Sequence, residues 1–377
     1  MLINWIDKSV SWVRAFLERG FLIKTVLIST LVSVFLQVPS FPEIETLFPT
    51  RAILEISNSP WTQIHYDAGS HAEKKTLRPL VPLIANVLRL KHTWQVYFLF
   101  AVANAVLLFL IARLLECRTG DRLVAFLVTL GLSCAYFGFS GYSDTKGWGD
   151  VIPFVLILCS MVWPRTMVVL IAHFLAMAGD ERSVISAVFA CWWFVCSSDR
   201  SFEKSLICRI LAQRHLIMAS LFAMVAYVAM RCYMHINLGF NMPMGNVGLP
   251  VLLEQNVEHL LPGLWGAFEG YWILLLLYVV GLFLTKKWMD GLLILVGMIG
   301  YSIACMMVHD VTRSICYVFP VVVLAIVEIH RDTHTRSRTD YMFLLVTFLN
   351  VLGPTYYLYG KLRSYAPAFF RIIQFLR

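Results

Sequence analysis

Apolar residues run along this chain in long blocks that are separated by short polar stretches. A block of about 20 apolar residues is long enough to cross the hydrocarbon core of a membrane as a helix. Shorter blocks also cross where protein covers their ends. We therefore predict eleven membrane-spanning helices, near residues 21–38, 94–115, 123–140, 151–163, 166–178, 184–198, 215–234, 260–285, 289–308, 314–329 and 341–358.

The composition agrees with this pattern. Of the 377 residues, 59% are hydrophobic and only 14% are charged, and the mean hydropathy is +0.72. A soluble globular chain carries about 25% charged residues, so that class is excluded. No long polar stretch is available for a separate soluble domain. We predict an all-α polytopic bundle in which residues 1–377 form a single transmembrane domain.

Three segments lie outside the predicted spans. Residues 1–20 mix basic side chains with aromatic and aliphatic ones, which is typical of a helix lying in the membrane interface. Residues 39–92 form a long first loop, in which we expect interfacial helices. Residues 361–377 are a short amphipathic tail.

The topology depends on residues 151–178, which form either one long span or two short spans broken at Pro164. With two spans and a cytoplasmic N-terminus, the basic clusters near 113–122, 200–214 and 286–287 all fall in cytoplasmic loops. Cytoplasmic loops carry an excess of Lys and Arg, so the charge pattern favours two spans. The long first loop then lies outside.

The predicted spans between residues 151 and 198 are short. About 14 residues at 1.5 Å each cover about 20 Å, against a hydrocarbon core of about 30 Å. Such helices persist where protein or a water-filled cavity covers their ends. We expect the outer leaflet to be indented here; the alternative is a thin bilayer or helices longer than the pattern shows.

The formal net charge is +8. No basic run alternates with aromatic residues as a nucleic-acid surface would, so we attribute the charge to anionic membrane lipids and predict no nucleic-acid partner. The nine cysteines show no CxxC pair and no Cys/His zinc spacing. Neither disulfides nor a metal cluster are therefore predicted.

Ionisable residues gather in four loops that this topology places on the same outer face. They belong to the first loop, to a glycine-rich segment at 141–150 and to two tight junctions near residues 180 and 310. The candidate site residues in these loops are Asp67, His71, Lys74, Lys75, Arg78, Asp144, Asp180, Glu181, Arg182, His309, Asp310 and Arg313.

Each loop also has a structural interpretation. Asp180 and Asp310 precede apolar helices, where Asp is a favourable N-cap. Arg182 and Arg313 can extend to the membrane interface along their own stems, and 141–150 suits an ordinary turn. Capping explains one Asp per helix, but not carboxylates paired with Arg or Lys in four loops. Because Arg and Lys hold phosphate oxygens and a carboxylate accepts a proton from a hydroxyl, the loops together indicate a polar, anionic, lipid-attached substrate.

In layout and in short motifs the chain resembles the GT-C superfamily of membrane glycosyltransferases, which use polyprenyl-phosphate-linked sugars. Members have a long first outer loop with a catalytic acid, a position that Asp67 matches, and a Pro-rich apolar stretch like residues 77–83 (LRPLVPL) follows it. Residues 180–183 (DERS) and 310–314 (DVTRS) are similar to outer-loop motifs of bacterial members. Many members also carry a soluble C-terminal domain, and we expect none within these 377 residues.

The resemblance implies transfer of one sugar, with inversion, from a polyprenyl-phosphate donor to a hydroxyl of a lipid or glycan acceptor. The implied setting is the outside of a bacterial inner membrane, in cell-envelope polysaccharide or glycolipid synthesis. Asp67 would be the general base, Asp180 and Asp310 would orient arginines or sugar hydroxyls, and His71 would bond acceptor or phosphate. The cations expected to stabilise the phosphate leaving group are Lys74, Lys75, Arg78, Arg182 and Arg313.

Other functions stay open at this point. The neighbour of Asp67 is Ala68, so no acidic pair for a metal is present there, although Mg²⁺ or Mn²⁺ stays open as a cofactor. A transporter or flippase of a lipid-linked or anionic solute would place ionisable groups near the bilayer midplane, where the sequence offers mainly His173 and Glu269. An oligosaccharide polymerase or ligase, an acyltransferase using His173 and a scaffold are further alternatives.

Overall fold

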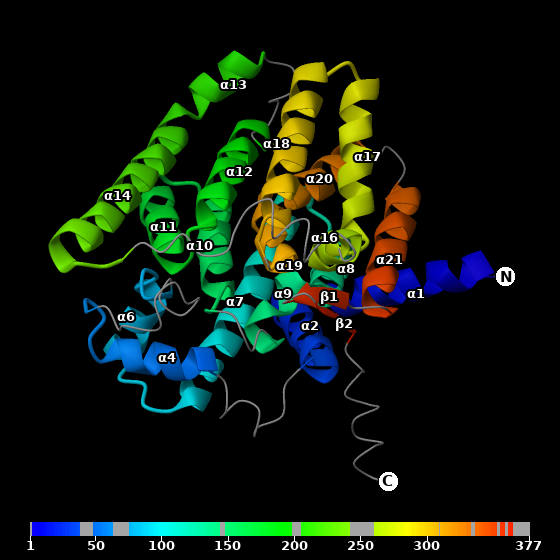
Figure 1. The fold of residues 1–377 in the computed structure, drawn as a ribbon. Helices are drawn as coiled ribbons and strands as arrows, with labels where there is room; N and C mark the ends of the chain where they lie inside the picture. Colours follow the sequence, from blue (N-terminus) through cyan, green and yellow to red (C-terminus); the bar gives the residue numbers. More distant parts are fainter. Residues whose placement is uncertain are drawn as a thin grey trace, which may run out of the picture.

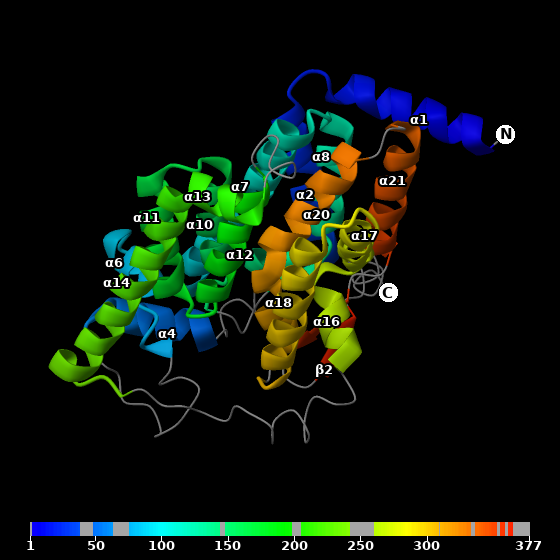
Figure 2. The same ribbon diagram turned by 90° about the horizontal axis from the view of Figure 1, so that it is seen from above.

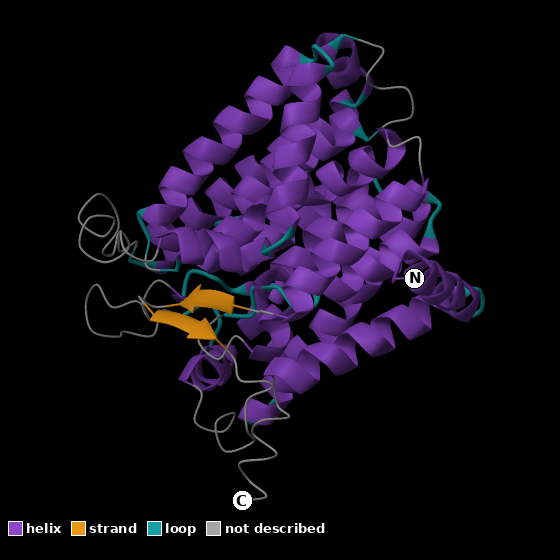
Figure 3. Ribbon diagram, turned by 90° about the vertical axis from the view of Figure 1, so that its right-hand side faces the viewer, coloured by secondary structure: helices purple, strands orange, loops and turns teal. Residues whose placement is uncertain are grey.

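A computed structural model describes residues 2–37, 48–62, 75–143, 148–197, 205–241, 260–308, 310–332, 336–352, 355–358 and 361–364. Apart from one two-stranded hairpin, the elements in these ranges are helices (Figure 3). The first part of the chain contains α1 (Leu2–Leu17), α2 (Phe21–Gln37), α4 (Phe48–Ser57), α6 (Leu80–Val87), α7 (Thr93–Thr119), α8 (Arg122–Leu132), α9 (Tyr136–Ser143), α10 (Val151–Val162), α11 (Thr166–Gly179) and α12 (Ser183–Cys196). The second part contains α13 (Leu206–Ala212), α14 (Arg214–Leu238), α16 (Leu260–Phe268), α17 (Tyr271–Leu284), α18 (Trp288–Met306), α19 (Val311–Ile315), the 3₁₀ turn η4 (Cys316–Val318), α20 (Phe319–Asp332) and α21 (Arg336–Leu352), followed by β1 (Thr355–Leu358) and β2 (Lys361–Ser364).

The helical membrane fold predicted from the sequence is confirmed. Four helices of the described chain are long and apolar enough to cross a membrane, and six if each of two bent helix pairs is one span. The four are Thr93–Thr119, Arg214–Leu238, Trp288–Met306 and Val311–Arg331. The predicted number of eleven spans is not confirmed, because several of the predicted segments form helices of only 10–17 residues.

The predicted break within residues 151–178 is present. Helix α10 ends at Val162 and α11 begins at Thr166, because Pro164 lies between them and has no backbone N–H to continue the helix. The helices α10, α11 and α12 have 12, 14 and 14 residues, so each is about 20 Å long.

The bundle has two ends that ionic contacts define. Arg118, near the end of α7, donates to the carbonyl of Ser197 just after α12, at 3.0 Å. Helix α1 lies across this end, where Arg14 pairs with Asp121 at 3.0 Å and with Asp340 at 2.7 Å. We call it the α1 end. The other end, where α6, α10, α12 and α19 begin, is the α6 end. Figure 2 shows α1 across the top of the view, with α4 and α16 at the bottom.

The core is centred on one nearly enclosed helical segment. The segment Val311–Arg331 comprises α19, η4 and most of α20, and 94% of the residues in its most apolar 18-residue stretch are buried. Aromatic rings surround it: Phe319 stacks on Phe137 with ring centroids 4.8 Å apart, and Tyr317 lies 4.9 Å from Phe154. In Figure 1 this segment lies among α12, α17 and α18, whereas α14 forms one edge of the bundle.

Two spans are bent, and asparagines from neighbouring helices bond the backbone at the bends. The pair α8/α9 bends by 62° and α16/α17 by 91°. Asn104 of α7 donates to the carbonyl of Gly138 at 2.7 Å and accepts from the N–H of Gly141 at 2.9 Å. Asn350 of α21 accepts from the N–H of Gly270 at 2.8 Å. Since lipid offers no hydrogen bonds, freed backbone groups at membrane depth need such internal partners.

Asn350 also joins the two bends to each other. Its side-chain amide lies 3.2 Å from the carbonyl of Gly131 in α8 and 3.3 Å from that of Phe268 in α16. Close packing accompanies this contact. A Cβ at Gly131 would lie 2.3 Å from the hydroxyl of Tyr271, so glycine is required there.

His173 is the main polar side chain in the middle of the bundle. Its Nε2 lies 3.0 Å from Ser160 of α10 and its Nδ1 lies 2.9 Å from Ser220 of α14. Ser160 donates its own proton to the carbonyl of Ile157 at 2.6 Å, so it accepts from Nε2–H, and Ser220 then donates to Nδ1. The ring is a satisfied neutral imidazole that joins three helices.

The C-terminal region differs from the prediction. The last predicted span was 341–358 and the tail 361–377 was expected to be amphipathic, but α21 ends at Leu352. Strands β1 and β2 follow, with Thr355 opposite Ser364 and Leu358 opposite Lys361. The intervening Pro354 lacks a backbone N–H, and the TYYL sequence of β1 favours a strand.

Replacing Asn350 with Leu is expected to destabilise the bundle. The change removes the partner of the Gly270 N–H and a partner of the Phe268 carbonyl, and each unsatisfied buried group costs about 1–3 kcal/mol. The apparent melting temperature in detergent should fall clearly. The matched control is Phe348→Leu on the exposed face of the same helix, which should change it little. An equal fall in both variants would contradict the assigned role.

Candidate functional site

Seven ionisable side chains form one continuous alternating chain at the α6 end. We call it the ion-pair chain. In order of contact its members are Glu181, Arg78, Asp180, Arg182, Asp150, Arg313 and Asp310. They come from the segment before α6, the start of α10, the α11–α12 junction and α19.

Asp150 is the central carboxylate, directly before α10. Arg313 donates two hydrogen bonds to it, from Nε to Oδ2 at 2.9 Å and from Nη2 to Oδ1 at 3.0 Å. Arg182 adds a third from Nη2 at 3.1 Å. These contacts join residues 163 positions apart in the sequence. They hold the start of α10 against α19 and against the α11–α12 junction.

Arg182 connects the central pair to Asp180. Its Nε and Nη2 donate to the two oxygens of Asp180 at 2.9 and 2.6 Å. Its guanidinium lies 5.1 Å from the centre of the Tyr317 ring, and it donates to Ser314 at 3.3 Å. A planar guanidinium suits this combination of forked bonding and stacking, and an ammonium would not.

Asp180 and Asp310 do not act as helix N-caps. Asp180 accepts from the backbone N–H of Arg182 at 2.9 Å, which is a turn contact, and α12 begins only after Arg182. Asp310 precedes α19 but makes no side-chain cap bond, and its Oδ2 binds Arg313 at 2.9 Å. The capping interpretation is therefore replaced by ion pairing, because each carboxylate is bound by a buried arginine.

Arg78 forms the other end of the ion-pair chain. It pairs with Asp180 at 2.9 Å and donates from Nε and Nη2 to Glu181 at 2.8 and 2.7 Å. Trp148 donates to its backbone carbonyl at 3.3 Å, and Lys75 lies 5.4 Å from the ring of Trp148. These contacts anchor the segment that directly follows the 63–74 part of the first loop.

Arginine neighbours keep the buried carboxylates charged. Burial would raise the pKa of Asp150, but Arg313 and Arg182 together lower it below its ordinary value. Burial also opposes ionisation of Asp180, and Arg182 and Arg78 more than offset this and lower its pKa. Since an uncompensated buried charge is very costly, Asp150 and Asp180 stay ionised only with these arginines beside them.

The sequence-predicted residues divide into two groups. The structure brings Arg78, Asp180, Glu181, Arg182, Asp310 and Arg313 into the ion-pair chain, with Lys75 beside it. The remaining predicted residues lie outside the described part of the chain; they are Asp67, His71, Lys74, Asp144 and His309.

Sequence reasoning missed the central residue. Asp150 belongs to the glycine-rich segment that was noted, but it was not selected as a site residue. Its signal was its position directly before the apolar run that begins at Val151. Arg231 of α14 was also missed; it donates to the carbonyl of Leu77, next to Arg78, at 3.0 Å.

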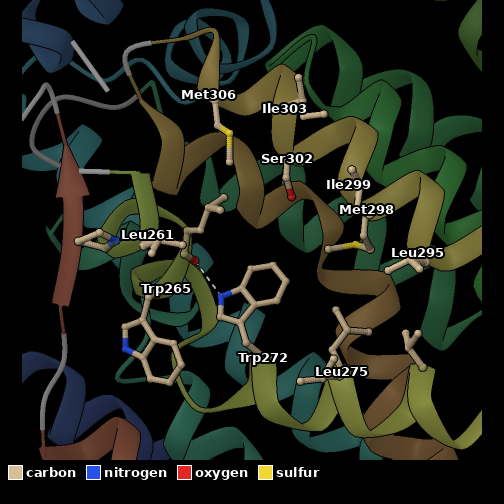
Figure 4. A pocket seen from close by; sticks show the side chains of 14 residues that line it. Leu261, Trp265, Trp272, Leu275, Leu295, Met298, Ile299, Ser302, Ile303 and Met306 are labelled. Atoms are coloured by element: carbon tan, nitrogen blue, oxygen red, sulfur yellow. Dashed lines mark hydrogen bonds between the residues drawn. The ribbon is translucent and has the colours of Figure 1, made fainter. Parts of the chain in front are cut away.

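An apolar pocket of about 860 Å³ lies between α16, α17 and α18 (Figure 4). Its walls come from the halves of α17 and α18 nearer the α6 end. Trp272 turns its indole N–H away from the pocket space by donating to the carbonyl of Leu264 at 2.8 Å. The chain reaches Asp310 four residues after the last lining residue. The lining residues are Leu261, Pro262, Leu264, Trp265, Trp272, Leu275, Leu276, Val279, Leu295, Met298, Ile299, Ser302, Ile303 and Met306.

The described donor set does not suit a divalent cation. No group of three His, Cys, Asp or Glu side chains in the described ranges is arranged to hold a metal ion. The carboxylates of the ion-pair chain are already bound by arginines, so a cation would have to displace a guanidinium. No step is therefore assigned to a metal here.

Comparisons with known proteins leave the functional assignment to the geometry. No family model matches the chain, and no curated protein matches it.

The stability of the protein should fall in acid. The lowered pKa values of Asp150 and Asp180 mean that their contribution is fully present above the ordinary carboxylate pKa of 3.8. It is lost as the pH falls from there through the lowered values of the folded protein. Melting temperatures in detergent should stay level from pH 7 to about pH 5 and decline from there down to about pH 2.

The control for this measurement is Asp150→Asn. It should be less stable at pH 7, by about 3–5 kcal/mol, because two buried arginines lose charge compensation. Its melting temperature should then fall less steeply with acid than that of the wild type. Parallel pH curves for the two proteins would contradict the assignment.

Proposed function

We propose that the protein is an integral-membrane glycosyltransferase that moves a sugar from a polyprenyl-phosphate donor to an acceptor hydroxyl. The observation that supports this most directly is the ion-pair chain. It gathers three arginines from separate segments of the chain at one end of the bundle. It also fixes Arg78, eleven residues after Asp67 in the sequence.

The proposed reaction needs a base and a cationic site. Asp67 accepts the proton of the acceptor hydroxyl, and the hydroxyl oxygen forms a bond to the anomeric carbon. The bond between that carbon and the phosphate oxygen breaks on the opposite face, so the configuration inverts and polyprenyl phosphate leaves. Arg78 and Arg182, with side chains 12% and 18% exposed, are the members of the ion-pair chain suited to stabilise the leaving phosphate.

The deeper members of the ion-pair chain have a positioning role in this proposal. Arg313 is only 3% exposed and is bound by Asp150 and Asp310, so it holds the site together and does not face the substrate. In this proposal the apolar pocket binds the lipid part of the donor, because its lining favours a hydrocarbon chain over a polar solute.

For the topology we propose eleven crossings with the α1 end in the cytoplasm and the α6 end outside a bacterial inner membrane. Each shorter apolar helix and each bent pair then counts as one span. Basic residues at the α1 end, such as Arg14, Arg118 and Arg122, agree with an excess of positive charge on the cytoplasmic side.

Thiol labelling tests this orientation. Cys232, an exposed native cysteine, is first replaced by Ser. A membrane-impermeant maleimide added to spheroplasts should then label a Val87→Cys variant. Val87 is 77% exposed, just before the loop that leads to α7. Native Cys117 and Cys208, exposed in α7 and α13, should react only after permeabilisation. Peptide mapping reads the sites, and labelling of Cys117 in intact spheroplasts would reverse the orientation.

Turnover tests the reaction itself. Purified protein incubated with polyprenyl-phosphate sugars and an extract of lipid or glycan acceptors should release polyprenyl phosphate. Asp67→Asn should abolish this release while leaving expression and melting temperature near those of the wild type. Glu43→Gln, another acid of the same loop, should retain activity. Unchanged release by Asp67→Asn would end the assignment of the base.

The two bent spans also favour a second candidate, a transporter of a lipid-linked or anionic solute. Transporters use broken helices near the bilayer midplane to bind their substrates, and α8/α9 and α16/α17 are broken helices joined by Asn350. Uptake of a lipid-linked sugar into proteoliposomes without release of carrier phosphate would favour this candidate.

A further inference from the structure

Buried contacts hold the backbone of Arg78 and one side of its guanidinium. Its backbone carbonyl accepts from Trp148, and the preceding carbonyl of Leu77 accepts from Arg231. The guanidinium is then fixed by Asp180, whose side chain is only 1% exposed. A guanidinium that is fixed in this way costs little to present to a ligand.

The other side of the Arg78 fork is covered by Glu181. This carboxylate takes two nearly parallel bonds of 2.7 and 2.8 Å, which is the geometry in which arginine also binds phosphate. Glu181 is nevertheless 41% exposed, by far the most exposed side chain of the ion-pair chain. It is therefore the member of the ion-pair chain that solvent or another anion can reach most easily.

Positive charge would remain around this position without Glu181. Lys75 is buried three residues before Arg78, and Arg231 lies against the Tyr227 ring at 5.6 Å. The backbone that carries Arg78 thus lies beside two further cations, Lys75 and Arg231, which favours an anion at this position.

We propose that Glu181 occupies an anion-binding site on Arg78 and that a phosphate group of the substrate displaces it. Glu181 is thus an internal substitute that keeps Arg78 paired while the site is empty. The identity of the anion as a lipid-linked phosphate rests on the proposed function; the shared chemistry is a phosphate oxygen pair, which inorganic phosphate also carries.

The test measures binding and needs no turnover. Full-length protein in detergent is titrated with farnesyl phosphate and, separately, with inorganic phosphate, by calorimetry or by the fluorescence of Trp148 and the other tryptophans. Glu181→Gln removes the competing charge and should tighten binding of farnesyl phosphate by about three- to tenfold. Arg78→Gln in the Glu181→Gln background should abolish that gain. Equal tightening with inorganic phosphate identifies the phosphate group alone as the ligand, and tightening with farnesyl phosphate only identifies the lipid-linked form.

The chain offers a matched control. Glu116 also binds two arginines, Arg113 and Arg122, but at the α1 end, so Glu116→Gln changes the net charge equally and should leave the affinity unchanged. Unchanged or weaker binding by Glu181→Gln, in a variant that melts within a few degrees of the wild type, overturns the proposal, as does equal tightening by Glu116→Gln. Tighter binding without sugar transfer would refute the proposed function alone, whereas transfer with unaltered affinity would refute this inference alone.

Discussion

The carboxylate of Asp150, enclosed by Arg182 and Arg313, is the interaction on which the α6 end depends. A charge buried among apolar helices is tolerable only when opposite charges and hydrogen bonds replace water. Two guanidinium groups supply them here, and each of these is bound in turn by a further carboxylate. The result is a set of helix junctions that cannot separate one at a time. Protein therefore covers the termini of the short helices α10, α11 and α12 that lie at the α6 end.

Buried backbone N–H and C=O groups also need partners that replace water. Wherever a span bends, N–H and C=O groups lose their helical partners, and Asn104 and Asn350 replace them. His173 connects side chains in the same way, because its two ring nitrogens are hydrogen-bonded to Ser160 and Ser220. Polar residues inside this bundle thus form two groups. Neutral side chains hydrogen-bond neighbouring helices, and the charged side chains of the ion-pair chain lie at the α6 end.

Much of the fold follows from the sequence. The apolar blocks located the helices, and Pro164 marked the break between α10 and α11. The junctions at Asp180 and Asp310 were selected for their paired charges, and the structure places both in one ion-pair chain. These features could be predicted because helices, helix breaks and paired charges each depend on residues that are close together in the sequence.

What the sequence did not reveal depends on contacts between distant segments. Asp150 resembled the end of a glycine-rich turn, and only the approach of Arg313 makes it central. Asn350 stood in an apolar run, where a single amide is conspicuous but its partners in α8 and α16 are not visible. The C-terminal hairpin was missed because the apolar residues of β1 extend the pattern of α21. The number of crossings could not be fixed by length, since several apolar helices have only 10–17 residues. A helix of that length crosses a membrane only where other protein covers its ends.

The separation of Asp150 from Arg313 along the chain has a consequence for biogenesis. A ribosome makes Asp150 long before Arg313 exists, but Arg182 follows after only 32 residues. The nascent protein can therefore pair Asp150 first with Arg182. Insertion of the central segment that begins at Val311 then completes the compensation. The order of synthesis matches the order in which the charges can safely leave water.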